Sequence, residues 1–233
     1  MELTSETLFL GVAWYVAFLF SLTVHEAAHA WAALKLGDPT AYHGGQVTLN
    51  PIPHIQRELF GTVIVPIISF FFAGWMMGWA SAPYDPVWAA RHPRRSGLMA
   101  LAGPVSNLLI ALIAGLALRV GLVRGTFSPA TVEDIGELRF VRAVAEGSAE
   151  GAAVLLSVLF ALNLLLFLFN LLPLPPLDGA AVLQLILSEE MALKYRQFIA
   201  QPMFALLGLV LAWKVLGILF WPILIVCLQI LYL

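Results

Sequence analysis

The sequence contains very few of the residues that most soluble proteins use for covalent or ionic stabilisation. Its 233 residues include a single cysteine, Cys227, and only 11% are charged, with a net charge of −2. One cysteine forms neither an internal disulfide nor a thiolate zinc cluster, so any metal must be held by histidine and carboxylate ligands. The small negative charge provides no basic surface for nucleic acid, which excludes nucleic acid as a partner.

Long polar segments are also scarce. Hydrophobic residues make up 61% of the chain and the mean hydropathy is +0.92, which indicates an integral membrane protein in contact with the lipid bilayer. We find no internal repeat and expect one transmembrane domain, residues 1–233, folded as an all-α multi-span helix bundle. The expected spans are 8–36, 98–123, 152–172 and 203–220, followed by an apolar tail, 221–233, after the break at Trp221-Pro222.

One motif within the first apolar segment combines metal ligands with a base. His25-Glu26-Ala27-Ala28-His29 places two imidazoles four residues apart, on one face of a helix and about one turn from each other. Imidazoles at this spacing can share one zinc ion, and Glu26 can take a proton from water held there. The motif therefore predicts a metal-dependent hydrolytic centre inside the membrane.

The same residues could be a coincidence, since proteins bury single histidines without any metal. Their place in an apolar segment argues against this interpretation, because each ionisable group at membrane depth costs roughly 2.5–3.5 kcal/mol on insertion. Two histidines and a glutamate together therefore indicate function.

A catalytic zinc site usually has three protein ligands and one position for water, so the histidine pair requires a third ligand. Few carboxylates lie at membrane depth, and Asp178 is the best placed of them. Asp178-Gly179 is also a common turn pair after a proline-rich break. From the residues alone, Asp178 is explained equally well as a ligand and as a turn residue.

Two further motifs follow the histidine motif along the chain. The first is Ala102-Gly103-Pro104-Val105-Ser106-Asn107, and the second is Asn170-Leu171-Leu172-Pro173-Leu174-Pro175-Pro176-Leu177-Asp178-Gly179. In this order the three motifs resemble the site-2 protease family of intramembrane zinc metalloproteases. The resemblance covers most of the chain, from about Thr23 to Leu187, and is closest to short bacterial-type members with neither a PDZ nor a CBS domain.

The resemblance implies a function and a role for each motif residue. His25, His29 and Asp178 would bind one zinc ion per chain, and Glu26 would be the general base. Asn170 would position the substrate backbone or stabilise the oxyanion. The implied reaction is hydrolysis of a peptide bond within or next to a transmembrane segment of a membrane-protein substrate, as in regulated intramembrane proteolysis.

Two other asparagines and two histidines are open to more than one interpretation. Asn163 lies seven residues before Asn170 on the same side of a helix, where it could serve the site or form an interhelical hydrogen bond. For Asn107 we favour helix packing. The roles of His43 and His54 stay open, because the sequence around His54 departs from that of the short members.

Zinc binding by the two histidines and Asp178 restricts the topology. The histidines lie near the C-terminal end of the first span and Asp178 lies just past the 152–172 span, so these two helices must run in the same direction. If 59–82 and 98–123 both crossed fully, Asp178 would emerge on the wrong side. Since Pro66 and two glycines interrupt 59–82, we expect this segment to be re-entrant.

The basic residues then divide between the two sides of the bilayer. One side receives Lys35, Arg57, Arg91, Arg94, Arg95, Lys194 and Arg196, and the other receives Arg119, Arg124, Arg139 and Arg142. The positive-inside rule makes the first side cytoplasmic. We expect a multi-pass protein of a bacterial-type cell membrane, with an exterior N-terminus and the zinc site toward the cytoplasmic face.

The polar stretch 41–50 follows the first span. Its glycines and the alternating Gln46-Val47-Thr48-Leu49, followed by Pro51 and Pro53, predict a short β-like hairpin or strand near the active site. Such a strand could pair with an unwound substrate by β-augmentation, and simple loop closure explains it equally well.

The same ligands would also suit other functions. One is a membrane metal carrier or sensor without hydrolytic activity, and another is a scaffold in which His and Asp serve helix packing alone. Glu26 argues against the carrier, because a binding site needs no base between its ligands. A measurement of bound zinc would distinguish the scaffold from the protease and from the carrier or sensor. No motif indicates the substrate or the oligomeric state.

Overall fold

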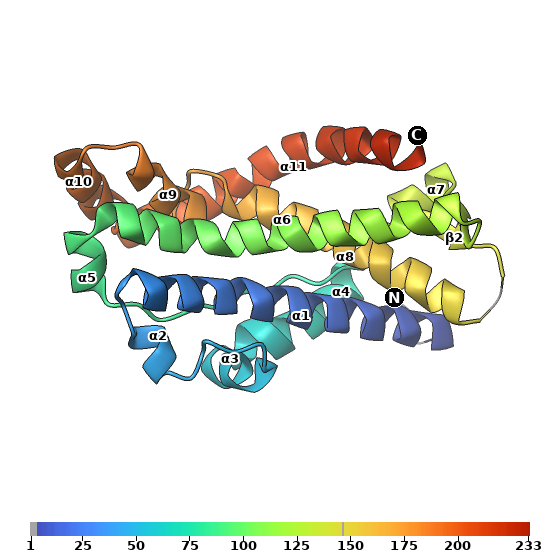
Figure 1. Cartoon of the computed structure of the whole chain (residues 1–233), viewed down its shortest axis with the longest axis horizontal. Helices are drawn as coiled ribbons and strands as arrows, with labels where there is room; N and C mark the ends of the chain where they lie inside the picture. The colour runs from blue at the N-terminus through green and yellow to red at the C-terminus, as the bar shows by residue number, and fades with distance from the viewer. Residues whose placement is uncertain (1–3, 146) are drawn as a thin grey trace.

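The protein is a bundle of long helices (Figure 1). The computed structural model describes residues 4–145 and 147–233. Within those ranges, four helices are long and apolar enough to cross a membrane. They are α1 (Ser5–Leu36), α6 (Pro93–Val123), α8 (Ser148–Asn170) and α11 (Pro202–Tyr232). The expected all-α, multi-span membrane architecture is therefore confirmed.

Local signals determine where the first span begins and ends. Thr4 caps α1, since its side chain accepts a hydrogen bond from the backbone N–H of Thr7 at 3.1 Å. Gly37 ends the helix with a φ of 105°, a left-handed conformation that glycine adopts without steric cost. The next residue, Asp38, accepts the backbone N–H of Asp85 at 2.8 Å. This bond ties the end of α1 to the start of α5 (Pro86–Arg91).

The spans alternate in direction, so that α1 and α8 run one way and α6 and α11 run the other (Figure 1). At one end of the bundle, Arg95 near the start of α6 donates a hydrogen bond to the backbone carbonyl of Leu36, the last residue of α1, at 3.2 Å. At the other end, Gly151 near the start of α8 faces the ring of Phe9 in α1. The parallel arrangement of α1 and α8 is the one that a shared metal ion requires.

Residues 58–81 leave one end of the bundle and return to it. After α3 (Pro51–Arg57), the chain bends by 112° into the π-helical turn η1 (Phe60–Ile64), which continues as α4 (Val65–Ala73). Gly74 ends α4 with a φ of 79°. The residues that follow, 75–81, form what we call the returning limb, which has no regular secondary structure.

Two hydrogen bonds hold the returning limb against the start of the segment. Trp79 donates its N–H to the carbonyl of Gly61 at 3.1 Å, and the Ser81 hydroxyl donates to the carboxylate of Glu58 at 2.7 Å. A Cβ on Gly61 would collide with the Trp79 carbonyl, so the two limbs approach closely only because glycine is present. The segment thus enters and leaves on one side, as the topology argument requires.

The stretch 41–50 is not a hairpin or strand, contrary to our prediction. It begins within α2 (Thr40–His43), turns at Gly45 with a φ of 72°, and continues through bends. The Asn50 side chain then caps α3, which leaves too few residues for two paired strands. The strands that the structure does describe pair antiparallel at the opposite end of the bundle: β1 (Phe127–Pro129) and β2 (Val141–Ala143).

The expected break at Trp221-Pro222, between a span at 203–220 and a separate tail, is also wrong. The helix α11 continues through Pro222 to Tyr232. A proline removes one backbone donor, and packing of the rest of the helix outweighs that loss. Leu224 and Leu228, beyond the proline, are buried in the core shared with α6 and α8.

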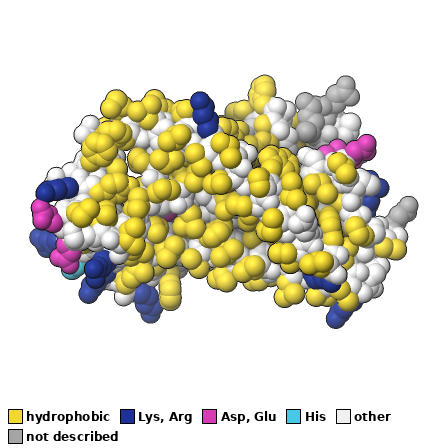
Figure 2. All heavy atoms as spheres, turned by 90° about the horizontal axis from the view of Figure 1, so that it is seen from above, with side chains coloured by type: hydrophobic (Ala, Val, Ile, Leu, Met, Phe, Trp, Pro, Cys, Tyr) yellow, Lys and Arg dark blue, Asp and Glu magenta, His cyan; other side chains and the backbone are white. Residues whose placement is uncertain are grey.

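Apolar side chains cover most of the face shown in Figure 2, and charged side chains gather toward the two ends. This distribution suits a molecule surrounded by lipid along its middle and by water at its ends. The chain is a multi-pass membrane protein.

Its remaining described elements are α7 (Val132–Gly136), α9 (Asp178–Val182), the 3-10 turn η2 (Leu183–Leu185) and α10 (Glu189–Ile199).

Candidate metal centre

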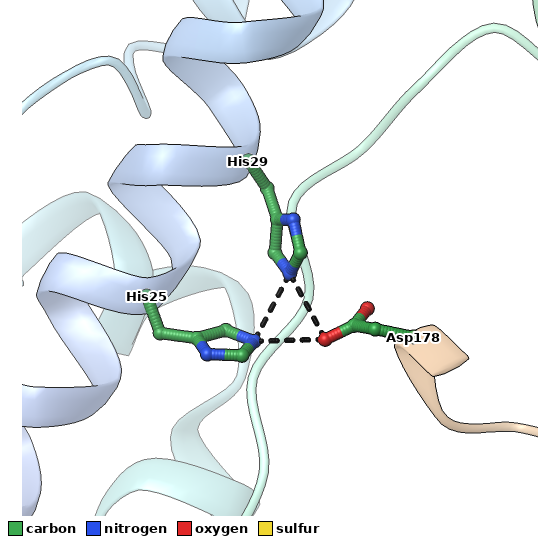
Figure 3. A group of neighbouring side chains, drawn as sticks. All are labelled: His25, His29 and Asp178. Atoms are coloured by element: carbon green, nitrogen blue, oxygen red, sulfur yellow. Dashed lines mark hydrogen bonds and ion pairs between the residues drawn. The ribbon is translucent and has the colours of Figure 1, made fainter. Parts of the chain in front are cut away.

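Two helices, α1 and α9, bring three side chains together (Figure 3). His25 and His29 project from one face of α1, and Asp178 is the first residue of α9. The Nε2 atoms of the two histidines are 3.0 Å apart. Oδ2 of Asp178 lies 3.2 Å from Nε2 of His25 and 3.3 Å from Nε2 of His29. The structure therefore places the three predicted ligands in one cluster.

The second nitrogen of each imidazole is already engaged. Nδ1 of His29 lies 2.8 Å from the backbone carbonyl of Met99, and Nδ1 of His25 lies 2.6 Å from Oδ1 of Asn107. Both partners belong to α6. A carbonyl oxygen can only accept, so Nδ1 of His29 carries the proton and its Nε2 keeps a free lone pair.

A chain of buried hydrogen bonds determines the orientation of the Asn107 amide. Nδ2 of Asn163 donates to the backbone carbonyl of Leu159 and to Oγ of Ser21, each at 2.8 Å. Because Leu159 offers only an acceptor, Oδ1 of Asn163 must face Nδ2 of Asn107, at 2.8 Å. Asn107 therefore turns its oxygen toward His25. Nδ1 of His25 donates to it, and Nε2 of His25 is left unprotonated.

Three acceptor atoms thus face one another with no donor between them. Oδ2 of Asp178 has no hydrogen-bond donor among the described residues, and such an arrangement is unfavourable unless a cation lies between the three atoms. Tetrahedral zinc with bonds of roughly 2.0–2.1 Å requires ligand atoms about 3.3 Å apart. The cluster fits zinc. No other group of His, Cys, Asp and Glu side chains meets in this way within 4–145 and 147–233.

Two glycines provide the space for the cluster. A Cβ on Gly103 of α6 would collide with Nε2 of His29 and would lie 2.6 Å from Nε2 of His25. A Cβ on Gly179 would collide with the backbone carbonyl of Leu171 at the end of α8. The absence of a side chain at Gly179 lets the neighbouring aspartate approach α1 closely.

Glu26 lies next to the cluster on the same helix. It is buried, with 4% of its surface exposed, and it is close enough for its charge to act on His29. Its carboxylate forms no hydrogen bond or ion pair with the part of the chain that the structure describes. Burial of a carboxylate without a partner costs free energy of folding. An unpaired carboxylate is, however, able to accept a proton, as a general base must.

Asn170 does not join the cluster. It is the last residue of α8, it is half-buried, and its Nδ2 donates to the carbonyl of Leu166 at 3.1 Å. Its contact with substrate stays a prediction. His54 is buried and uses Nε2 to bond the backbone carbonyl of Thr48 at 3.1 Å, and His43 is exposed at the end of α2. Both of these histidines therefore lie outside the metal cluster.

Comparison with known proteins identifies the family. The model of peptidase family M50 matches residues 13–211, which include all three motifs. The chain belongs to peptidase family M50. This is the site-2 protease family, so the resemblance seen in the motifs is confirmed. The M50 relatives carry the name zinc metalloprotease, and zinc is the metal that suits the cluster of this chain.

Curated relatives of this M50 chain come from bacteria. YwhC of Bacillus subtilis, described as a candidate zinc metalloprotease, is 37% identical over 170 residues, which are 72% of this chain and 66% of YwhC. Rip2 of Mycolicibacterium smegmatis, with the same description, is 29% identical over 74% of this chain and 56% of its own. Rip2 of Mycobacterium tuberculosis is 30% identical over 72% of this chain and 54% of its own.

The chain thus spans between about half and two thirds of the length of these relatives. No solved structure gives a significant match to it.

The sequence favoured helix packing for Asn107, whereas in the M50 chain Asn107 bonds directly to His25. The spacing between Gly103 and Asn107 within their motif already indicated this contact with the histidines. Asn107 lies four residues after Gly103, so it stands one helical turn from the glycine that faces both imidazoles. Asn163, which was left open, bonds Asn107 in turn.

Replacing Asn107 with alanine should weaken zinc binding by roughly 10- to 100-fold. His25 would lose the acceptor that determines its tautomer and the orientation of its ring. Asn107→Asp should keep most of the affinity, because a carboxylate oxygen still accepts from Nδ1. Competition with a fluorescent zinc chelator, on purified protein in detergent, measures the affinity. Equal affinities of wild type and Asn107→Ala would show that Asn107 serves packing alone.

Proposed function

We propose that this protein is a zinc-dependent intramembrane endopeptidase, which cleaves a peptide bond within or next to a transmembrane segment of a membrane-protein substrate. The observation that carries the proposal is the convergence of three unprotonated ligand atoms beside the buried, unpaired carboxylate of Glu26. The cluster lies inside a helix bundle, and the face of the bundle in Figure 2 is largely apolar. A site in that position is accessible to substrates that are themselves in the membrane.

Each residue of the site has a distinct part in the proposed reaction. His25, His29 and Asp178 would hold one zinc ion, which when bound supplies a Lewis acid that activates water and polarises the peptide carbonyl. A carboxylate oxygen of Glu26 would take a proton from the attacking water and deliver it to the nitrogen of the leaving amine. Asn170 would position the substrate backbone or stabilise the oxyanion through its side-chain amide.

The substrate must be unwound near the scissile bond. A helix holds each peptide carbonyl in a hydrogen bond to the N–H four residues later, which blocks attack on the carbonyl. The substrate would therefore enter the site with a short extended stretch.

We also propose that the protein lies in a bacterial-type cell membrane with the metal cluster toward the cytoplasm. The cluster lies nearer the end of α1 than its start, and Arg95 meets α1 at that end. This end carries seven of the twelve basic residues, against four at the other end. The positive-inside rule favours this orientation.

Removing zinc should abolish cleavage. Purified protein in liposomes is mixed with single-span model proteins, and mass spectrometry of the products locates the cleaved bond. We expect cleavage within or next to the span, complete loss after treatment with a zinc chelator, and recovery when Zn²⁺ but not Mg²⁺ is added, because nitrogen ligands select zinc. Cleavage that survives chelation would contradict the proposal. Stoichiometric zinc without cleavage of any span would favour a carrier or sensor.

A further inference from the structure

A cavity of about 550 Å³ lies beside the returning limb. Most of its walls come from the limb at Trp75–Trp79, from α8 at Leu162 and Leu166, and from α11 at Val210 and Trp213. Val210 and Trp213 are about half exposed, so the cavity opens on the outer, lipid-facing side of the bundle.

Aromatic contacts join the walls of this cavity. Trp75 of the limb stacks on Trp213 of α11, with ring centroids 5.5 Å apart and planes at 11°. Phe169 of α8 packs edge-on against the same Trp213, with centroids 6.2 Å apart. The cavity is therefore bounded by packed rings.

The cavity lies close to the metal cluster along the bundle. Phe18 lines it and lies seven residues before His25, hence on the same face of α1 and about 10 Å away along the helix. Next to the α11 wall, Ala212 belongs to the same buried cluster as Leu177, the residue before Asp178. A peptide in the cavity would therefore reach the metal cluster after about three extended residues.

Lys214 is the charged side chain that lines this otherwise apolar cavity. It lies about 18 Å along α11 from Pro202 and about 27 Å from Tyr232, close to the middle of the helix. It has no hydrogen-bond or ion-pair partner among the described residues. An intramembrane lysine costs roughly 2.5–3.5 kcal/mol on insertion and generally faces a partner or a polar cavity. Its partner should therefore come from outside the chain.

We propose that the cavity binds the part of the substrate's transmembrane segment next to the scissile bond, and that Lys214 pairs with an acidic side chain of that segment. The apolar walls suit the side chains of a membrane-spanning segment, and the ammonium complements one carboxylate. A phospholipid is a poorer match, because its acyl chain has no charge and its headgroup lies at the interface. The inference rests on the proposed function and defines its substrate class as spans that contain Asp or Glu.

A charge exchange tests the inference. Wild type, Lys214→Glu and Lys214→Met are placed in liposomes with one single-span model protein that carries Glu, Gln or Lys, in turn, at each position within about five residues of the cleaved bond. Wild type should cleave the best Glu version about tenfold faster than its Gln counterpart. Lys214→Glu should instead cleave the Lys version fastest, and Lys214→Met should cleave the Glu and Gln versions equally. Equal rates with wild type at every position, or no reversal by Lys214→Glu, would overturn the inference.

Lys194→Met is the matched control, because Lys194 is exposed on α10 and pairs with Glu190 at 2.6 Å. It should keep the preference for Glu. Failure of the proposed function gives a different result, since wild type would then cleave no version of the model protein.

Crosslinking distinguishes a bound peptide from bound lipid. In the Glu26→Gln background, a photoreactive amino acid at Leu209, which lines the cavity, should capture the model protein. The same group at Ile225, on the exposed face of α11, should capture lipid. Capture of lipid alone at Leu209 would overturn the inference even if the model protein is cleaved.

Discussion

Changing Glu26 to glutamine should lower the rate of peptide cleavage by about 10²- to 10⁴-fold while zinc stays bound. Glutamine has nearly the same size as glutamate but cannot take the proton from water. The ligands should keep their positions, because Glu26 forms no hydrogen bond or ion pair with any described residue. Cleavage of a single-span model protein in liposomes and elemental analysis of zinc, on the same preparations, measure both properties.

Glu190→Gln is the matched control for this change, because it removes the same charge from the exposed surface of α10. Its cleavage rate should equal that of wild type. Undiminished cleavage by Glu26→Gln would exclude Glu26 as the general base. If wild type and Glu26→Gln both bind zinc and neither cleaves, the chain is a metal carrier or sensor.

Changing Gly103 to alanine should lower zinc affinity by on the order of 100-fold, and cleavage should fall with it. The added methyl group would occupy the place where the ligand atoms converge, against Nε2 of both histidines. The helix α6 cannot easily move away, because Met99 and Asn107 on either side of Gly103 bond to the same two imidazoles. Zinc affinity is measured by chelator competition, and helix content by circular dichroism.

Gly217→Ala is the control for the effect of alanine itself. Gly217 lies within α11, and a Cβ there meets nothing within 4 Å. Both substitutions favour the helix by roughly 0.5–1 kcal/mol, so only the steric effect at the cluster distinguishes them. Normal zinc affinity in Gly103→Ala would show that the imidazoles hold the metal on a side away from α6.

The four spans and the histidine pair could be predicted because they depend on short-range properties of the chain. A run of about 20 apolar residues in a bilayer must satisfy its backbone hydrogen bonds internally, which makes it helical. The common face of His25 and His29 follows from helix geometry. The re-entrant course predicted for 59–82 followed from the number of crossings once Asp178 was taken as the third ligand.

The errors concern features that depend on packing. The stretch 41–50 has strand-forming residues, but Asn50 starts a helix after it and no partner strand remains. Pro222 resembles a helix end, and burial of Leu224 and Leu228 against distant helices keeps α11 continuous. The start of α3 did have a local signal in the Asn50 cap and Pro51, whereas the continuity of α11 had none.

The sequence by itself determined that this protein lies in a membrane, which side chains could bind its metal, and in which order the spans follow. These features depend on hydropathy, side-chain chemistry and helical periodicity, which are properties of neighbouring residues. Only the tertiary structure decided which nitrogen of each histidine is free to bind a metal. The partners that decide it, Asn107 and Met99, lie 82 and 70 residues away along the chain. The packing of α6, α8 and α11 around α1 brings these partners to the histidines, and the packing of the returning limb against α8 and α11 forms the cavity beside Lys214.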